Sequence, residues 1–259
     1  MENRPGAGTN IANEHVARSP ADGYTLLINT AAVAINMSLY RKVPFDTLRD
    51  FAGISLFSMS PNILVVHASV PAKNAKELIA LARAHPGKLN FSSAGNGTTQ
   101  HLSGELFKVR TKTSMAHIPF KGSAPSMTAL ISGEVDLSFA NIPAISQHVK
   151  SGRLRPLANL GPKRAAQLPE VPTMKEAGVD GVEVVVWYGV LAPAKTPREI
   201  VNTLAGAIAK AARAPDVTQR LLDLGAEPVG NTPEEFSKLL REEVAKWAEV
   251  VKTSGARVD

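Results

Sequence analysis

The sequence predicts an α/β fold with largely parallel sheets, and three observations support this prediction. Apolar patterns typical of strands and helices alternate along the chain, as they do where helices connect parallel strands. The 259 residues suffice for one large or two small domains, and 44% hydrophobic with 20% charged residues is ordinary for globular proteins. The longest apolar stretch, residues 182–194, contains Glu183 and is shorter than the roughly 20 residues that span a bilayer. A membrane protein is therefore not expected.

Strands are expected where short apolar runs lie between turn residues. The first, residues 24–29, follows the turn pair Asp22-Gly23. Two more, at 53–59 and 63–66, are expected to be separated by Ser60-Pro61-Asn62. The remaining strands are expected at 89–92, 115–118, 135–139 and 156–160, with a further Val-rich strand that ends at Trp187 and Tyr188.

Helices are expected where capping residues precede periodic apolar residues. Asn74 with Glu77 opens a helix that continues to residue 85, before Pro86-Gly87. Further helices are expected at 98–109, 124–131 and 143–149. Three T-x-x-E boxes, which begin at Thr173, Thr196 and Thr232, predict three later helices, the last of them reaching about residue 252.

The distribution of charge favours an anionic partner. The net charge is +6, and residues 61–160 carry eleven basic against four acidic side chains, whereas residues 1–60 carry five of each. Aromatic residues make up only 5% and no basic-aromatic RNA motif is present, so a small anion is the simpler partner and nucleic acid is not expected. With no cysteine and no histidines three or four apart, neither a disulfide scaffold nor a helical metal pair is expected, and no cofactor is expected.

The segment from residue 90 to 101 is the most informative for function. An expected strand ends in small residues, and Gly95 and Gly97 precede a helix that opens at Thr98. Because the first turn of a helix has unpaired N–H groups and the positive end of the helix dipole, it suits a carboxylate or phosphate. The segment is neither a dinucleotide fingerprint nor a P-loop. From these residues alone, an anion seat and a plain strand-to-helix turn are equally favoured.

Other candidates carry weaker signals. The loop with Gly6 and Gly8 and the loop that contains Lys121, Gly122 and Ser123 both enter helices through small residues. Trp187 and Tyr188 could flank a ligand, although aromatic residues of this kind more often pack in the core.

No signature of an enzyme is present. A G-x-S-x-G nucleophile motif is lacking, and acidic pairs such as Glu242-Glu243 lie beside basic residues on a helix. His101 could act as a base, but a histidine at this position of a helix more often packs or caps.

Six ordered motifs resemble one family. They are residues 2–8 (ENRPGAG), 20–27 (PADGYTLL), 93–102 (SAGNGTTQHL), 118–125 (IPFKGSAP), 168–173 (LPEVPT) and 187–193 (WYGVLAP). Together they resemble the tripartite tricarboxylate transporter receptor family, the Bug-type periplasmic solute-binding proteins. The resemblance runs from Glu2 to the C-terminus.

The resemblance implies a two-lobed, type II periplasmic-binding-protein fold with a ligand cleft between the lobes. Lobe 1 would comprise residues 1–62 and 189–259, and lobe 2 residues 63–188. In the family, backbone N–H groups and waters at helix N-termini hold the carboxylate of the ligand. The residues expected at the ligand are Ser93, Ala94, Gly95, Asn96, Gly97, Thr98, Thr99, Gly6, Gly8, Thr30, Ala31, Gly122, Ser123, Asn141, Trp187 and Tyr188. Asn141 stands where the family often has Asp.

One departure from the family concerns the N-terminus. Members begin with a signal peptide, a first strand, a glycine-rich loop and a helix, and no counterpart precedes Glu2 in this sequence. A shortened chain or a misplaced start codon is the preferred explanation, and a variant with a half-formed site is the alternative.

The function expected from the resemblance is capture of a small organic carboxylate for the permease subunits of a tripartite tricarboxylate transporter. The protein is expected to be periplasmic, monomeric and not an enzyme. Two alternatives stay open, an α/β enzyme acting on a small anion and a ligand-sensing module that signals to a partner protein. Dicarboxylates, tricarboxylates, acidic amino acids and aromatic acids all remain candidate ligands.

Overall fold

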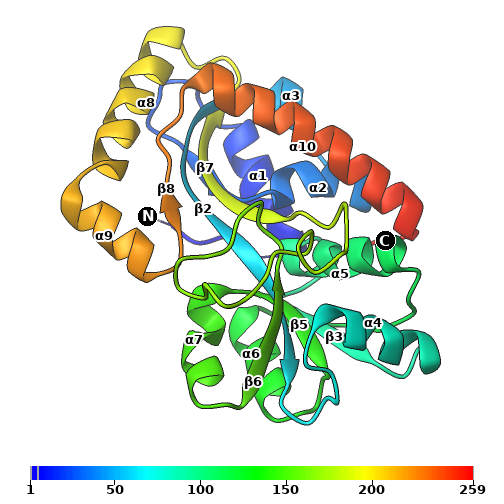
Figure 1. Ribbon diagram of the computed structural model, residues 1–259. Helices are drawn as coiled ribbons and strands as arrows, with labels where there is room; N and C mark the ends of the chain where they lie inside the picture. The colour runs from blue at the N-terminus through cyan, green and yellow to red at the C-terminus, as the bar shows by residue number, and fades with distance from the viewer. Residues whose placement is uncertain (1, 5, 259) are drawn as a thin grey trace. The chain divides into compact units, whose positions relative to one another are not determined.

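The computed structural model describes residues 2–4 and 6–258 and divides into two compact units (Figure 1). Unit 1 comprises Met1–Met59 and Val186–Asp259, and unit 2 comprises Ser60–Val185. The chain passes between the units within two strands, β2 (Phe51–His67) and β7 (Val185–Pro193). The lobe boundaries expected from the sequence lie three residues further along the chain at both crossings, and the assignment of these units as ligand-closing lobes stays a prediction.

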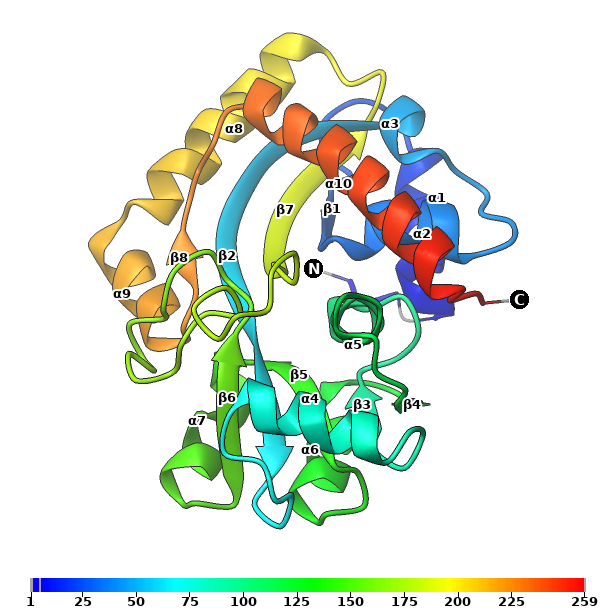
Figure 2. The same ribbon diagram turned by 45° about the vertical axis from the view of Figure 1, so that its right-hand side comes forward.

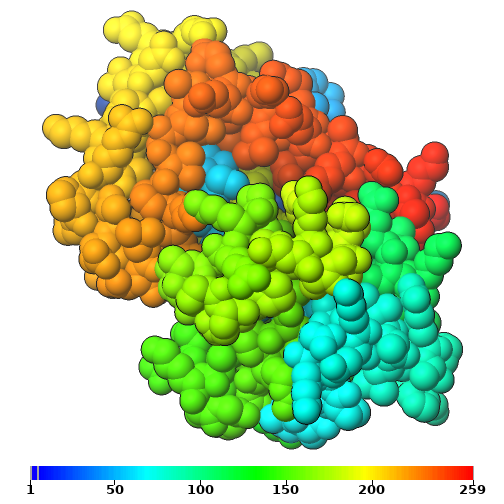
Figure 3. All heavy atoms as spheres, viewed as in Figure 1, coloured from blue at the N-terminus to red at the C-terminus, as the bar shows by residue number. Residues whose placement is uncertain are grey.

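Both chain segments of unit 1 contribute strands to it. Strand β1 (Leu27–Asn29) is antiparallel to β7, β7 neighbours β2, and β8 (Glu227–Pro228) is antiparallel to β2. The helical segments are η1 (Ala7–Thr9), α1 (Asn10–Ala17), α2 (Ala32–Leu39), α3 (Thr47–Asp50), α8 (Arg198–Ala212), α9 (Pro215–Asp223) and α10 (Pro233–Ser254). Helix α10 packs along α2 (Figure 2), and α8, α9 and α10 form much of the visible surface of this unit (Figure 3).

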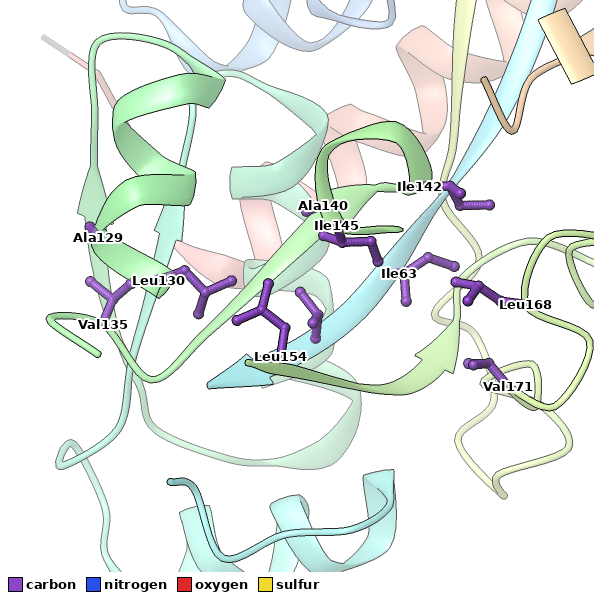
Figure 4. Packing of buried hydrophobic residues seen from close by; sticks show 11 residues of the cluster. Ile63, Ala129, Leu130, Val135, Ala140, Ile142, Ile145, Leu154, Leu168 and Val171 are labelled. Atoms are coloured by element: carbon purple, nitrogen blue, oxygen red, sulfur yellow. The ribbon is translucent and has the colours of Figure 1, made fainter. Parts of the chain in front are cut away.

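Unit 2 contains a mixed sheet in the order β4-β3-β5-β2-β6. Its remaining strands are β3 (Asn90–Ser93), β4 (Ala116–Pro119), β5 (Leu137–Asn141) and β6 (Leu154–Asn159). Its helices are α4 (Ala75–Ala84), α5 (Thr99–Thr111), α6 (Ser123–Ile131) and α7 (Ile142–Lys150). Buried side chains of β2, β5, β6, α6 and α7 form one core, which includes Ile63, Leu130, Ala140, Ile145 and Leu154 (Figure 4).

The prediction of largely parallel sheets is wrong. Strands joined by helical crossovers are parallel as expected, since β3 pairs in parallel with both β4 and β5. However, β2 lies between β5 and β6 and is antiparallel to both. Strand β2, which comes earlier in the chain, lies between β5 and β6. The order of strands and helices along the sequence does not indicate that a strand from another part of the chain is inserted there.

The expected break at Ser60-Pro61-Asn62 is also wrong, because β2 continues through it. Its pairs with β8 end at Met59 and its pairs with β5 begin at Asn62. Pro61 therefore lies where its missing N–H removes no bond to either of these neighbours.

The three T-x-x-E boxes have different outcomes. Thr232 and Glu235 form the complete capping box of α10, as predicted. Thr173 and Glu176 make both capping hydrogen bonds, but a single turn follows and no helix forms, because Gly178 takes a positive φ of 78°. Helix α8 begins at Arg198 with Pro197 as its N-cap, and the hydroxyl of Thr196 makes no capping bond.

Two further expectations need correction. The first strand is limited to Leu27–Asn29, and Tyr24 is 93% exposed instead of buried. Trp187 lies near the beginning of β7 and not at the end of a strand. In contrast, Asn74 caps α4 through the N–H of Glu77, as the sequence predicts.

Candidate functional site: two glycine loops

The loop Ser93–Thr99 of unit 2 connects β3 to α5, and its shape depends on glycine. Gly95 and Gly97 have φ values of 133° and 79°, in the region that favours glycine. A Cβ at Gly95 would lie 3.3 Å from the carbonyl oxygen of Phe120. Thr98 then caps α5, because its hydroxyl accepts the N–H of His101 at 3.3 Å. The prediction of a strand, a glycine turn and a helix with Thr98 at its start is confirmed.

Side chains within unit 2 engage part of the backbone of this loop. The N–H of Ala94 donates to Oε1 of Gln100 at 2.7 Å, and the N–H of Gly95 donates to Oγ of Ser93 at 3.1 Å. The N–H of Gly97 donates to Nδ1 of His101 at 3.3 Å. These three N–H groups are therefore satisfied within the protein, which the sequence alone did not indicate.

Three other N–H groups of the segment differ from these. Within residues 2–4 and 6–258, no acceptor lies at the N–H of Asn96, Thr99 or Gln100. Thr99 and Gln100 open α5 and are only 7% and 8% exposed. Unpaired N–H groups at the positive end of a helix are a suitable seat for a carboxylate.

The neighbouring loops of unit 2 converge on the same edge of the sheet. Because β3, β4 and β5 are parallel, the segments after their carboxyl ends lie at one edge, where α/β sheets commonly bind ligands. The N–H of Gly122 donates to the carbonyl of Ala94 at 3.1 Å, which fixes the entry into α6 beside the Ser93–Thr99 loop. Ser123 and Lys121 are exposed there.

Asn141 ends β5 and caps α7 without a side-chain capping bond. Its backbone pairs with Asn62 of β2, a buried residue that sequence reasoning missed. Nδ2 of Asn62 donates to Oγ of Ser103 at 3.1 Å, whereas its Oδ1 has no partner among the described residues. A buried asparagine this far from the glycine loop in sequence gives no local signal.

Two histidines stack beneath the Ser93–Thr99 loop. The ring centroids of His101 and His117 are 4.1 Å apart at an interplanar angle of 15°, and His117 also stacks on Phe91 at 4.8 Å. Burial, together with the charges of His117 and Lys108, lowers the pKa of His101 to about 3. Burial and Lys108 lower the pKa of His117 to about 4. Both rings are thus neutral at pH 7.

In unit 1, buried asparagines hold the loop that contains Gly6 and Gly8. Nδ2 of Asn36 donates to the carbonyl of Gly8 at 2.6 Å and to Oδ1 of Asn10 at 2.8 Å. Nδ2 of Asn29 donates to Oδ1 of Asn13 at 2.6 Å and to the hydroxyl of Thr9 at 3.3 Å.

This network also reaches the end of β1. Oδ1 of Asn29 accepts the N–H of Thr30 at 2.7 Å, so the same amide group bonds both Thr30 and the hydroxyl of Thr9. Ala31 is fully buried at the N-cap of α2, and its carbonyl already accepts the N–H groups of Ala34 and Ile35. Pro5, within the same sequence motif, lies outside the described residues. Sequence reasoning found this loop but missed the four asparagines, which are distributed over residues 10–36.

The structure favours a packing role for Trp187. Its ring is 1% exposed and lies edge-on to Phe236 at 5.4 Å. Its indole N–H donates to Oε2 of Glu243 at 3.1 Å, and Trp247 donates to the same oxygen at 2.8 Å. The ring of Tyr188, in contrast, lies 6.1 Å from that of Phe57. Because Tyr188 is only partly buried, it is the better candidate for contact with a ligand.

The part of the chain that the structure describes shows neither a metal-binding cluster nor a membrane-spanning helix. In those ranges, no group of three or more acidic or histidine side chains is arranged to hold a metal ion. None of the described helices combines the length and the apolar composition that crossing a bilayer requires.

Comparison with known proteins identifies relatives over almost the full chain. Residues 1–256 match the model of the tripartite tricarboxylate transporter family receptor. A protein encoded in the tcbD-tcbE intergenic region of Pseudomonas sp. (strain P51) is 38% identical over 97% of this chain and 75% of its own length. Protein BugT of Bordetella pertussis is 35% identical over 100% of this chain and 80% of its own length.

Solved structures agree with these relatives. Rpa4515 of R. palustris with adipate has a TM-score of 0.90 and 39% identity, and the match covers 98% of this chain and 85% of that one. MatC of Rhodopseudomonas palustris with bound malate has a TM-score of 0.88 and 31% identity, and the match covers 96% of this chain and 86% of that one. The two-lobed periplasmic-binding fold predicted from the sequence motifs is confirmed.

Proposed function

This chain belongs to the tripartite tricarboxylate transporter receptor family, and we propose that it captures a small carboxylate outside the cytoplasm and delivers it to a membrane permease. One observation carries the proposal for this chain. Among the described residues, the N–H groups of Asn96, Thr99 and Gln100 have no acceptor, and they lie at the helix end where a carboxylate is best stabilised.

The relatives support a carboxylate as the ligand. Adipate and malate are the molecules bound in the two solved structures, and both are dicarboxylates. In this chain the donors at the proposed seat are neutral backbone N–H groups, which recognise the carboxylate group and not the remainder of the molecule. We therefore propose only the class of ligand, a small dicarboxylate or a related acid, and not the carbon skeleton of that ligand.

We propose two groups of contacts, one from each unit. In unit 2 they are the Ser93–Thr99 loop, Gly122, Ser123 and Asn141. In unit 1 they are Gly6, Gly8, Thr30, the backbone of Ala31, and Tyr188.

The partner and the location follow from the family and belong to the proposal. A family receptor would work in the periplasm and hand its ligand to permease subunits of a tripartite tricarboxylate transporter. The family and its solved members are solute-binding proteins and not enzymes, so the prediction that this chain is not an enzyme is confirmed. No observation favours the sensing module.

A pair of substitutions at Thr99 tests the proposed seat. Proline at the first position of a helix removes the N–H and is otherwise tolerated there, as Pro233 shows at the start of α10. The extended backbone of Thr98 suits a following proline. Thr99→Pro therefore deletes one donor, whereas Thr99→Ala keeps that donor and removes only the side chain.

Calorimetric titration with adipate, malate, citrate, glutamate and benzoate would identify the ligand and then compare the variants. For the best acid, Thr99→Pro is expected to weaken binding about tenfold or more, since a hydrogen bond to a charged group is worth about 1.5–3 kcal/mol. Thr99→Ala should lose clearly less. Equal losses in both variants would contradict the proposed seat, and no binding of any acid by the unmodified chain would contradict the function.

A further inference from the structure

The stacked histidines of unit 2 are the buried titratable groups that carboxylate binding leaves unused. His101 lies on α5 and is 5% exposed, and His117 lies on the edge strand β4. Phe91 of β3 covers the other face of His117 at 4.8 Å. The three stacked rings lie directly beneath the segment that the proposed ligand would contact.

One nitrogen of each ring forms a hydrogen bond with this segment, and in the neutral rings both nitrogens can act as acceptors. Nδ1 of His101 accepts the N–H of Gly97 at 3.3 Å, so this nitrogen carries no proton. Nε2 of His117 lies 2.7 Å from the hydroxyl of Ser93, which in turn accepts the N–H of Gly95 at 3.1 Å. A protonated imidazole has an N–H on both nitrogens and accepts no hydrogen bond.

We propose that His101 and His117 are positioning residues that hold the Ser93–Thr99 loop in its ligand-receiving shape only while both are neutral, so that acid weakens binding. The inference rests on the function proposed above and concerns how that same site keeps its shape. Protonation of His101 would place an N–H against the N–H of Gly97. Protonation of His117 would make Nε2 a donor to the Ser93 oxygen, so that the hydroxyl would donate only to the carbonyl of Gly95, its other acceptor at 3.1 Å. Either change would rearrange the hydrogen bonds of the loop beside the N–H groups that have no acceptor among the described residues.

The surrounding charges favour the neutral state. The charged groups that face the pair within unit 2 are Glu105 and Lys108 of α5. Oε1 of Glu105 is 4.0 Å from Nε2 of His101, but Nζ of Lys108 lies 2.9 Å from both oxygens of Glu105 and takes up its charge. The lowered pKa values, about 3 and about 4, agree with this geometry.

Three variants separate the titration of the rings from their packing. In the double variant His101→Asn/His117→Gln, the amide oxygens replace Nδ1 and Nε2 as acceptors and do not titrate. His101→Leu keeps the bulk of the side chain but removes the acceptor of the Gly97 N–H. His85→Asn is the matched control, because His85 is an exposed histidine of the same unit, away from the loop.

The first readout is the pH dependence of the affinity for malate by calorimetry, between pH 7 and pH 3.5. Protonation of malate affects every variant equally and cancels in the comparison. Relative to the double variant, the unmodified chain should lose about twofold more affinity at pH 4 and about fivefold at pH 3.5, as pKa values of about 3 and about 4 require. The His85→Asn control should follow the unmodified chain, and His101→Leu should bind weakly even at pH 7. Parallel profiles for the unmodified chain and the double variant would overturn the inference.

The second readout needs no ligand and keeps the inference testable if the proposed function fails. Long-range ¹⁵N spectra of the imidazoles at pH 7 should show a proton on Nε2 of His101 and on Nδ1 of His117. The protection of the Gly97 amide against hydrogen exchange, relative to its intrinsic rate at each pH, should fall in acid in the unmodified chain and not in the double variant. A proton on Nδ1 of His101, or equal exchange in both proteins, would overturn the inference. A lack of malate binding together with the expected spectra would instead remove only the proposed ligand.

Discussion

The glycine loops of the two units are held by different chemistry. In unit 2, the side chains of Gln100, His101 and Ser93 accept N–H groups of the Ser93–Thr99 loop. In unit 1, the amide of Asn36 donates to the carbonyl of Gly8, and that of Asn29 donates to the hydroxyl of Thr9. The two imidazoles titrate in acid, with pKa values of about 3 and about 4, whereas amides do not titrate. The loop of unit 2 should therefore respond to acid, and the amides that hold the loop of unit 1 should not.

The loops also differ in backbone strain. In the Ser93–Thr99 loop the positive φ values fall on Gly95 and Gly97. In unit 1, Ala7 and Thr9 have φ values of 45° and 79°, which a residue with a Cβ adopts only at some expense in free energy. Glycine thus permits the backbone conformation of the Ser93–Thr99 loop. In unit 1, the buried asparagines must instead hold a backbone conformation that is unfavourable for Ala7 and Thr9. Removal of a side chain that holds the loop should therefore reduce the free energy of unfolding most in unit 1. In unit 2, such a removal should mainly change how the free energy of unfolding depends on pH.

Acidification is expected to give the largest effect. The folded pKa values of His101 and His117, about 3 and about 4, lie below the unfolded value of 6.5, so the unfolded chain binds more protons over this range. Stability is therefore lost as the pH falls from about 6.5 towards 4. A depression like that of His117 alone corresponds to about 3 kcal/mol. Urea unfolding at pH 7 and pH 4 should show the unmodified chain losing more stability than His101→Asn/His117→Gln; equal losses would contradict the comparison.

Asn36→Leu should break the anchor of unit 1. The change leaves the carbonyl of Gly8 and Oδ1 of Asn10 without their donor, at about 1–3 kcal/mol for each buried group, so a loss of about 3 kcal/mol is expected. Because no titratable group is involved, the loss should be the same at pH 7 and pH 5. The exposed Asn202→Leu is the matched control and should change stability by less than about 0.5 kcal/mol. A loss that varied with pH would argue against the contrast between the loops.

Gly104→Ala tests the support beneath the histidine stack. A Cβ at Gly104 of α5 would lie 2.2 Å from the ring of Phe91, on which His117 stacks. Overpacking of this kind should reduce the free energy of unfolding by about 2 kcal/mol. Gly206→Ala in α8 meets no atom within 4 Å and should instead add about 0.5–1 kcal/mol. Denaturant unfolding of both variants measures the difference, and a neutral Gly104→Ala would show that this helix packs less tightly than described.

Alanine substitutions at two matched capping residues distinguish an effect on stability from an effect on ligand binding. Thr98 caps α5 and Thr232 caps α10, each through its hydroxyl. Alanine at either position should reduce stability by about 1 kcal/mol in thermal or urea unfolding. Only Thr98→Ala should also weaken carboxylate binding, because only α5 opens at the proposed seat. Weaker binding in Thr232→Ala to the same degree would place the seat elsewhere.

Local signals in the sequence predicted the elements that local chemistry determines. The glycines before Thr98, the capping box of Thr232 and the Asn74 cap each act within a few residues, and the structure confirms them. Pairing between residues far apart in the sequence determined the remaining elements. Strand β2 continues through Pro61 because its partners change at that point.

The same limit applies to the candidate site. Ser93, Gly95 and Gly97 could be found because they are neighbours in the chain. The anchors could not be found in this way. His117 lies 24 residues from Ser93, and Asn36 lies 28 residues from Gly8, so only the folded chain brings them together.

The most direct test of the central claim is a carboxylate titration followed through the backbone amides of ¹⁵N-labelled protein at pH 7. With adipate or malate, the amide resonances of Asn96, Thr99 and Gln100 should shift most, since these N–H groups have no acceptor in the described structure. The amides of Ala94 and Gly97 should shift less, because Gln100 and His101 already accept them. Saturable binding that left the Thr99 and Gln100 amides unmoved would contradict the claim that this loop receives the carboxylate.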